Sequence, residues 1–146
     1  MKPVTLSFPC DLKGLGHKGL HYMVRRRRSE TSKAEAHAAW IVARRPRFTV
    51  PVDVEYWVIQ NRLMDDDNVV AALKPVRDAL FARRRWRCPA PKTKAGFRYI
   101  SEPGLMLPDD DPEWFRLAGV YMSKCAKGER PSVTLIVRER ARNKTK

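Results

Sequence analysis

The chain has 146 residues, of which 43% are hydrophobic and 32% are charged, which suits one soluble globular domain and excludes a disordered chain or two ordinary domains. Thirty lysines and arginines stand against sixteen aspartates and glutamates, so the net charge is +14. Because such an excess makes a compact chain repel itself, it indicates a polyanionic partner, with nucleic acid ahead of an anionic membrane. A basic surface that serves only solubility is the alternative.

Several classes of protein are excluded by the remaining composition. The longest apolar runs, such as 69–73 and 132–137, are far too short to cross a membrane, and the N-terminus lacks the apolar core and cleavage site of a signal peptide. The three cysteines (Cys10, Cys88 and Cys125) show no CxxC spacing. This argues against a disulfide framework or a zinc site and fits a reducing cytoplasm. A bound metal would therefore be held by oxygen atoms.

The first part of the chain predicts a strand, a helix and a second strand. Residues 3–8 alternate loosely and predict a short strand. Candidate N-caps at 29–32 precede an alanine-rich segment, which predicts a helix over 32–45. β-branched and aromatic residues alternate over 48–59 and predict a strand. Its alternation puts four residues on one face: Val52, Val54, Tyr56 and Val58.

The middle of the chain predicts one helix and a long irregular segment. The helix is expected over 67–84, and Pro75 should kink or restart it, since proline lacks the backbone donor. Proline and glycine are frequent over 86–108, and no periodicity is sustained there. This segment is expected to be a long loop insertion, with at most a short strand at 96–100.

The C-terminal part predicts a hairpin and a tail. Residues 116–124 and 132–140 alternate on either side of Lys127-Gly128, which predicts a β-hairpin. Residues 1–140 are therefore expected to form a single α+β domain of two layers, in which the helices pack on one face of a mixed β-sheet. A basic tail is expected over 141–146.

Six of the sixteen acidic residues lie in two triplets, at 65–67 and 109–111. Neighbouring carboxylates raise one another's pKa unless a cation shares them, and oxygen ligands suit Mg²⁺. In an extended segment Asp65 and Asp67 would face one ion, and one aspartate of the second triplet would complete the site. The alternative is that Asp66 or Asp67 caps the helix and that the second triplet forms a turn that opens a helix of its own.

Lys74 follows Asp67 by seven residues, which is about two helical turns and therefore nearly the same helix face. There its ammonium would approach the metal or a phosphate oxygen and stabilise charge that develops on the scissile phosphate. An ion pair with Asp78, four residues further on, is an equal alternative.

Two arginine runs are candidates for contacts with DNA phosphates. A run of this kind is more often a solvated face, but the nearby carboxylates favour a role in DNA binding. The candidates are Arg25, Arg26, Arg27, Arg28, Arg83, Arg84 and Arg85.

Several short motifs occur in a characteristic order. Asp65-x-Asp67-Asn68, then Lys74 and Asp78-Ala79-Leu80, then Pro108-Asp109-Asp110 before the last strands, resemble the RusA family of Holliday-junction resolvases. The resemblance covers the order of elements over most of the chain. It implies a small, basic, homodimeric crossover junction endodeoxyribonuclease of phage or prophage origin, which acts in the cytoplasm of a bacterial host in DNA recombination and repair.

The resemblance also implies the chemistry of the site. Mg²⁺, with Mn²⁺ as a possible substitute, would be bound by Asp65, Asp67 and Asp110, with Asp111 as the rival of Asp110. Lys74 would assist cleavage, although the lysine of the family follows Asp-Asn by three residues, a place that Ala71 takes here. The implied activity is resolution of four-way DNA junctions by paired symmetric nicks.

Two other functions are compatible with the same residues. One is a non-catalytic basic module that binds nucleic acid and uses the aspartates as caps. The other is a magnesium nuclease that acts on forks or flaps. Metal-dependent cutting separates the first from a nuclease, and the choice of DNA substrate separates the second from a resolvase.

Overall fold

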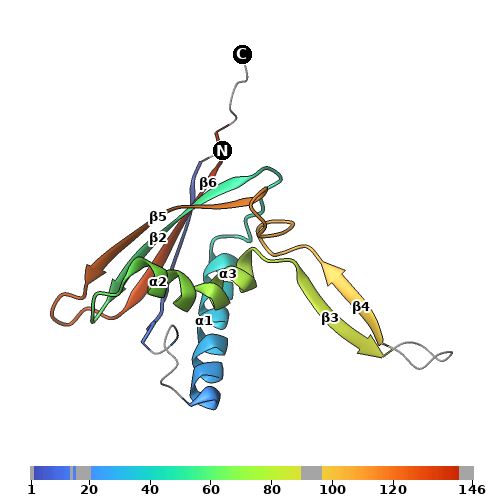
Figure 1. Ribbon diagram of the computed structural model, residues 1–146. Coiled ribbons are helices and arrows are strands. Elements are labelled where there is room, and N and C mark those ends of the chain that lie inside the picture. Colours follow the sequence, from blue (N-terminus) through green and yellow to red (C-terminus); the bar gives the residue numbers. More distant parts are fainter. Residues whose placement is uncertain (1, 14, 16–20, 90–96, 142–146) are drawn as a thin grey trace.

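Two layers make up the body of the protein in the computed structural model, which describes residues 2–13, 15, 21–89 and 97–141 (Figure 1). One layer is a mixed sheet of four strands in the order β1 (Val4–Pro9), β6 (Ser132–Glu139), β2 (Val52–Gln60) and β5 (Phe115–Lys124). The other layer consists of α1 (Tyr22–Val42), α2 (Asp66–Ala72) and α3 (Lys74–Leu80), which lie on one face of the sheet. The predicted α+β class is confirmed.

The central strand β2 joins the two halves of the sheet. It pairs with β6 in the antiparallel and with β5 in the parallel orientation. On the face of β2 that points away from the helices, Trp57 is 44% exposed and stacks on Tyr121 of β5, with ring centroids 4.3 Å apart. The four side chains that the sequence places on one face are all buried against the helices: Val52, Val54, Tyr56 and Val58. Burial of this apolar face decides which side of the sheet the helices cover.

The two C-terminal strands are present, but they do not pair as a hairpin. A turn in which Gly128 adopts a φ of 82° follows β5, yet β2 lies between β5 and β6 in the sheet. The turn at Lys127-Gly128 was predicted correctly, but the pairing of the two strands was not. The pairing depends on β2, which has β6 on one edge and β5 on the other. The parallel pair of β2 and β5 requires a crossover connection, and α2 and α3 are part of it.

Helix α1 begins before the predicted caps. Its N-cap is His21, whose Nδ1 accepts a hydrogen bond from the N–H of Met23 at 3.3 Å. The hydroxyl-bearing residues at 29–32 lie inside the helix, where Thr31 Oγ1 donates to the carbonyl of Arg27 at 2.9 Å. The Ser32 hydroxyl instead lies 3.6 Å from Cys10 Sγ, outside the helix. These hydroxyl groups therefore have partners other than the backbone N–H groups of a helix start. The prediction of a start at 29–32 was therefore wrong.

The end of α1 lies close to the expected place. Arg44 and Arg45 adopt φ values of 69° and 52°, a left-handed conformation that ends helices. The chain then turns at Pro46, whose carbonyl accepts a hydrogen bond from Trp40 Nε1 at 2.9 Å.

Pro75 restarts the second predicted helix. Helix α2 ends at Ala72, and Pro75 lies in the first turn of α3, where its missing N–H has no intrahelical partner to lose. Helix α3 ends at Leu80, earlier than predicted, so the arginines at 83–85 do not lie on the helix. The apolar residues of this helix pair are buried in the core: Val69, Ala72, Leu73, Val76 and Leu80.

The predicted loop insertion contains a two-stranded antiparallel ribbon. Strand β3 (Arg84–Pro89) pairs with β4 (Phe97–Glu102), and the ribbon, here called the arm, extends away from the body (Figure 1). The strand expected at 96–100 is part of β4, but β3 was missed, because its arginines conceal any apolar alternation. Residues 90–96 lie outside the described residues, as does the predicted tail apart from Ala141.

Cys10 and Cys125 are free thiols, and burial raises the pKa of the Cys10 thiol above its ordinary value. The side chain of Cys88 lies outside the described part of the chain. Among the helices of the described residues, none has the length and apolar character needed to cross a membrane.

The buried side chain of Gln60 ties the end of β2 to the segment that follows β1. Its Oε1 accepts a hydrogen bond from the N–H of Leu12 at 2.9 Å, and its Nε2 donates to the carbonyl of Cys10 at 2.8 Å. The residue is only 3% exposed, so water cannot replace the amide without a rearrangement.

Replacing Gln60 with leucine is therefore expected to lower the free energy of unfolding by about 2–4 kcal/mol, because one buried N–H and one buried carbonyl lose their partner. Urea unfolding followed by circular dichroism measures this loss. Asn61→Ala, at the exposed neighbouring position, is the control and should cost no more than about 0.5 kcal/mol. Equal losses for the two variants would contradict the structural role of Gln60.

Candidate active site

Helices α2 and α3 share one side that faces residues 109–111, the acidic turn. A pocket of about 340 Å³ lies there. Its lining consists of Val70, Ala71, Lys74, Arg77, Asp78 and Asp110. The five helix positions follow a spacing of three and four residues, which puts them on one helix face. Asp110 and Lys74 thus line the same pocket.

The aspartates at 65–67 are exposed at the N-terminus of α2. Asp65 is the N-cap, with φ −64° and ψ 149°, yet its side chain makes no capping hydrogen bond. Asp66 and Asp67 lie in the first turn, where negative charge interacts favourably with the helix dipole. Within the described residues, none of the three carboxylates has a hydrogen bond or an ion pair.

Two expectations about this triplet are corrected. The cap position belongs to Asp65 and not to Asp66 or Asp67. The segment is also not extended throughout, because the helix already begins at Asp66. The argument that alternation makes Asp65 and Asp67 face the same ion therefore does not apply, and the relative direction of their side chains depends on the helix start.

Backbone N–H groups organise the acidic turn. Asp109 Oδ1 accepts hydrogen bonds from the N–H of Asp110 at 2.8 Å and from the N–H of Arg83 at 3.3 Å. Asp111 Oδ1 accepts from the N–H groups two and three residues later, at 3.0 and 3.3 Å. An Asp-rich turn was the predicted alternative, but it opens no helix, since β5 begins at Phe115.

The carboxyl group of Asp109 has a pKa below its ordinary value. Desolvation, the largest single cause, acts to raise this pKa, but the hydrogen bonds from the N–H groups of Asp110 and Arg83 and the nearby arginine charges together outweigh it. These positive charges are those of Arg85 and Arg83. The stability that Asp109 contributes is therefore fully present above the ordinary aspartate pKa and is lost as the pH falls through the lowered value.

Arg77 holds the acidic turn against α3. Its Nε lies 2.8 Å from Asp110 Oδ2, and its Nη2 donates to the Asp110 carbonyl at 2.8 Å. The guanidinium carbon also lies 4.2 Å from the centroid of the Phe115 ring. The two charged side chains are 33% and 25% exposed, so the pair is only partly screened by water. Arg77 thus positions Asp110 at the edge of the pocket.

Tyr56 of β2 interacts electrostatically with the same pair. Burial raises the pKa of its hydroxyl group well above the ordinary value. The charge of Arg77 opposes this shift, while Asp110 and Asp78 add to it. Tyr56 therefore stays neutral at physiological pH.

Lys74 forms the ion pair that was its alternative role. Its Nζ lies 2.8 Å from Asp78 Oδ2, with side-chain exposures of 70% and 40%. Exposed pairs of this kind contribute about 0–1 kcal/mol, so a phosphate can replace Asp78 as the partner of the ammonium at little cost.

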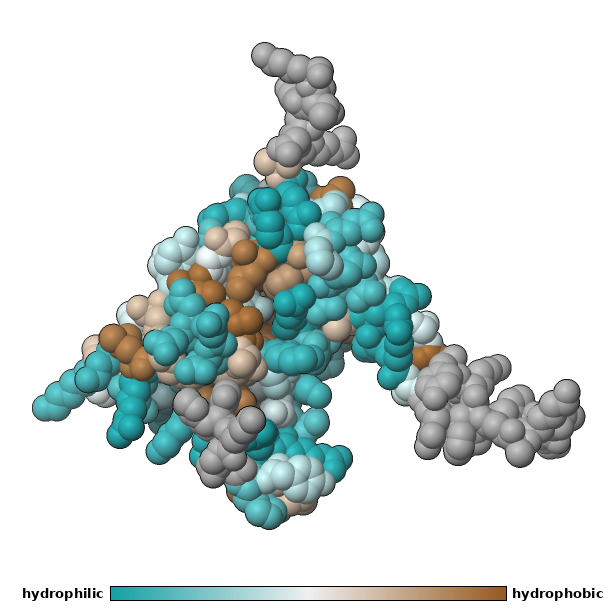
Figure 2. Space-filling view, viewed as in Figure 1, coloured by the Kyte–Doolittle hydropathy of each residue, from teal (hydrophilic) through white to brown (hydrophobic). Residues whose placement is uncertain are grey.

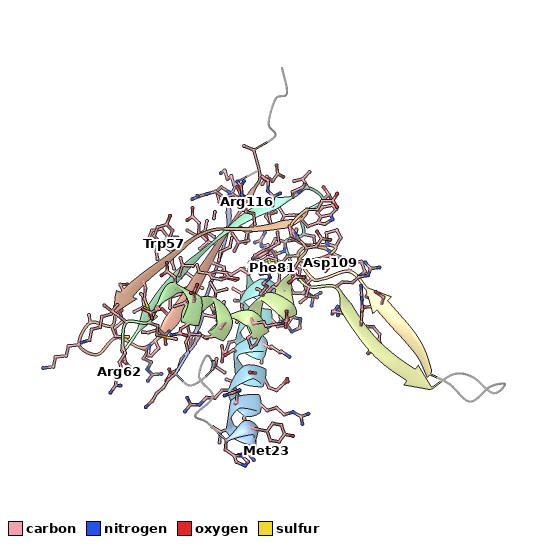
Figure 3. The ribbon with its side chains drawn as sticks, viewed as in Figure 1. Met23, Trp57, Arg62, Phe81, Asp109 and Arg116 are labelled. Atoms are coloured by element: carbon pink, nitrogen blue, oxygen red, sulfur yellow. The ribbon has the colours of Figure 1, made fainter. Side chains whose placement is uncertain are left out.

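The two aspartate triplets do not form one ligand set in the described residues. No group of three or more histidine, cysteine, aspartate or glutamate side chains lies close enough there to hold a metal ion together. In Figure 3, Arg62, which shortly precedes Asp65, and Asp109 lie at opposite ends of the α2–α3 pair. The donors nevertheless fit Mg²⁺ chemically, because the ion is usually held by one or two carboxylates with water and substrate phosphate. Asp65 and Asp67 meet that requirement without a third carboxylate.

Comparisons of the chain with protein-family models, with curated proteins and with solved structures find no match. The resemblance to the RusA family therefore rests on the motifs and on the order of elements, and it stays a prediction.

The first arginine run does not lie on one side of the molecule. Arg25 to Arg28 are consecutive residues of α1, so their side chains are distributed around the helix. Arg26 and Arg27 are exposed, whereas Arg28 is half-buried and its Nη1 donates to the carbonyl of Lys13. Arg26 and Arg27 are the better candidates for contacts with DNA.

The second arginine run lies at the base of the arm. Arg83 precedes β3, and Arg84 and Arg85 begin it. Arg83 Nε donates to Ser101 Oγ at 2.6 Å, and Arg84 pairs with Glu102 at 3.0 Å. These contacts join the two sides of the arm at its base.

Two residues of the site were not predicted. Arg77 lies three residues after Lys74, and this helical spacing is a signal that could have identified it. Tyr56 was assigned to a strand face without a role, and the sequence contains no signal for its electrostatic interaction with Asp110.

Proposed function

We propose that the chain is a magnesium-dependent endodeoxyribonuclease that resolves four-way DNA junctions by paired symmetric nicks. The observation that carries the proposal is the state of the carboxylates at 65–67, which are adjacent, exposed and without a partner in the described residues. In a chain of net charge +14, arginine partners for three aspartates are abundant. Because these carboxylates nevertheless stay unpaired at the N-terminus of α2, a cation is favoured as their partner.

Asp65 and Asp67 would hold the ion, and the acidic turn, which lies at the other end of the α2–α3 pair, would have to move for Asp110 to reach it. Within that turn, Asp110 lines the pocket and keeps Oδ1 available while Oδ2 binds Arg77, which favours it over Asp111. Mn²⁺ would replace Mg²⁺, since both accept oxygen ligands. When bound, the ion would supply an activated water and neutralise charge on the phosphate.

The other residues of the pocket have positioning and electrostatic roles in this proposal. Arg77 fixes the carboxylate and the carbonyl of Asp110. Lys74 would exchange Asp78 for a phosphate oxygen of the DNA and stabilise the charge that develops there. The neutral Tyr56 hydroxyl adds no charge near Arg77 and Asp110.

Binding would come from arginines that displace counterions from the DNA backbone. Arg26 and Arg27 of α1 and the run at 83–85 are exposed for this purpose. Two symmetric nicks across a junction require two sites related by a twofold axis, which a homodimer supplies. We therefore propose that the active form is a homodimer on branched DNA.

Cutting of four-way, forked and linear DNA, compared side by side in Mg²⁺, in Mn²⁺ and in EDTA, tests the proposal. We expect paired nicks in the four-way junction with either metal and none in EDTA. Equal cutting of the linear duplex would overturn the assignment as a resolvase, and preferred cutting of forks would assign the nuclease to that substrate.

One observation favours a non-catalytic nucleic-acid-binding module as the second candidate. Lys74 and Asp110 both have protein partners, so the described pocket is already neutralised without a metal. Such a module would bind junction DNA equally well with and without Mg²⁺ and would cut none of the three substrates.

A further inference from the structure

The arm is a separate structural feature of the molecule. Strands β3 and β4 pair over six residues each, and within the described residues neither packs extensively on a helix or on the four-stranded sheet. Figure 1 shows the ribbon leaving the body beyond α3. A two-stranded ribbon by itself is marginally stable in water, so a partner that binds it would also stabilise it.

The composition of the arm indicates the chemistry of that partner. Five arginines and one glutamate occur in residues 83–89 and 97–102, the described part of the arm and its base. Arg85 and Trp86 are exposed at the beginning of β3. On the visible face, Figure 2 shows mostly hydrophilic surface at the base of the arm. The excess of arginine favours a polyanion as the partner of the arm.

The base of the arm is fixed to both parts of the candidate site. Strand β3 follows α3 after a short connection, and the Arg83 N–H donates to Asp109 in the acidic turn. On the other strand, the chain after β4 returns to the body, where the Met106 N–H donates to the carbonyl of Leu80 at 2.8 Å. In Figure 3, Asp109 lies where the arm meets the body. The direction of the arm is thus coupled to the positions of Arg77 and Asp110.

We propose that the arm binds double-stranded DNA by entering its major groove, at a place separate from the phosphate that is cut. The major groove admits a two-stranded β-ribbon, and arginines on such a ribbon reach the phosphates on both sides of it. Because its base is fixed to the acidic turn, the arm would orient one duplex relative to the pocket. This inference rests on the proposed function only in taking DNA as the partner.

The test compares two variants that each lose three positive charges. The arm variant is Arg85→Gln/Arg87→Gln/Arg98→Gln. The control is Lys124→Gln/Lys127→Gln/Arg130→Gln, at exposed positions near the connection between β5 and β6, on the opposite side of the body from the arm (Figure 1). Affinity for a linear duplex and for an immobile four-way junction is measured by fluorescence anisotropy in EDTA over a range of salt concentrations.

The arm variant is expected to bind both DNAs at least about 10-fold more weakly, with a salt slope reduced by about 2–3 units, while the control changes affinity less than about threefold. Hydroxyl-radical footprinting should show that the arm variant loses a protected segment of duplex that the control retains. Wild-type affinity of the arm variant, or an equal loss in the control, would overturn the inference. If the triple variant does not fold, the single exposed change Arg85→Glu is measured in the same way and decides the question.

Two outcomes separate this inference from the proposed function. If the wild type never cuts DNA but its binding depends on the arm, the arm inference stands and the nuclease proposal falls. If the wild type cuts junctions and the arm variant binds them as tightly, the nuclease proposal stands and the arm inference falls. Loss of self-association by the arm variant in sedimentation without DNA would make the arm a dimer contact and overturn the inference.

Discussion

Asp67→Asn is expected to reduce cutting of four-way junctions in Mg²⁺ by about 100-fold or more, because asparagine removes the charge that holds the cation. Binding of the junction in EDTA should change less than about threefold, since the lost carboxylate attracts no phosphate. Single-turnover cutting and fluorescence anisotropy measure the two effects on the same preparation. Loss of activity with retained binding is the result that a metal ligand predicts and that a folding defect does not.

The matched control for this experiment is Asp66→Asn. It removes the same charge from the same helical turn, and Asp66 and Asp67 both lie in the first turn of α2 without a described partner. The control is expected to keep cutting within about fivefold of the wild type, since the proposal gives Asp66 no role as a metal ligand. Equal losses for both variants would indicate a general effect of charge at the helix N-terminus and would remove Asp67 as a ligand.

Gly104→Ala is expected to lower the free energy of unfolding by about 2–4 kcal/mol, because the added methyl group overpacks a rigid site. A Cβ at this position would lie 2.6 Å from the Phe81 carbonyl oxygen, 2.7 Å from that of Leu107 and 2.8 Å from that of Ala82. All three are backbone atoms, so the chain itself must move. Thermal and urea unfolding measure the loss.

The same substitution is expected to impair cutting, since Gly104 lies between β4 and the acidic turn and connects the arm to Asp110. Gly128→Ala is the control: nothing lies within 4 Å of its added Cβ, and its φ of 82° should cost about 1–2 kcal/mol. Unfolding of Gly104→Ala at the wild-type denaturant concentration would show that the segment adapts and would contradict the packing argument.

Local signals were sufficient for several elements. The alternation of β2 and the restart of the helix at Pro75 follow from the geometry of a strand and from the missing proline donor. The start of α1 was misplaced, because hydroxyl-bearing residues also find partners in the middle of a helix, as Thr31 does with the carbonyl of Arg27. Ordinary cap residues therefore predicted a boundary that the structure does not have.

In the candidate site, too, some contacts follow from local sequence signals and others do not. The ion pair of Lys74 and Asp78 follows from helical spacing. The sequence predicted it as an equal alternative to an approach of Lys74 to the metal or to a phosphate oxygen. Asp110 was expected to join Asp65 and Asp67 around one ion, whereas its pairing with Arg77 was not predicted, because that contact joins residues 33 positions apart. The orientation of Asp65 and Asp67 was predicted from an extended segment that the structure replaces with the first turn of α2.

The sequence by itself determined the α+β class, the buried face of β2 and the concentration of carboxylates and arginines in short segments, since these depend on periodicity and composition over a few neighbouring residues. Only the tertiary structure decided that β2 separates β5 from β6, that residues 84–102 contain an arm, and that Arg77 holds Asp110 at the pocket. The physical reason is that these features depend on pairing and packing between distant segments, whose free energy no local pattern contains.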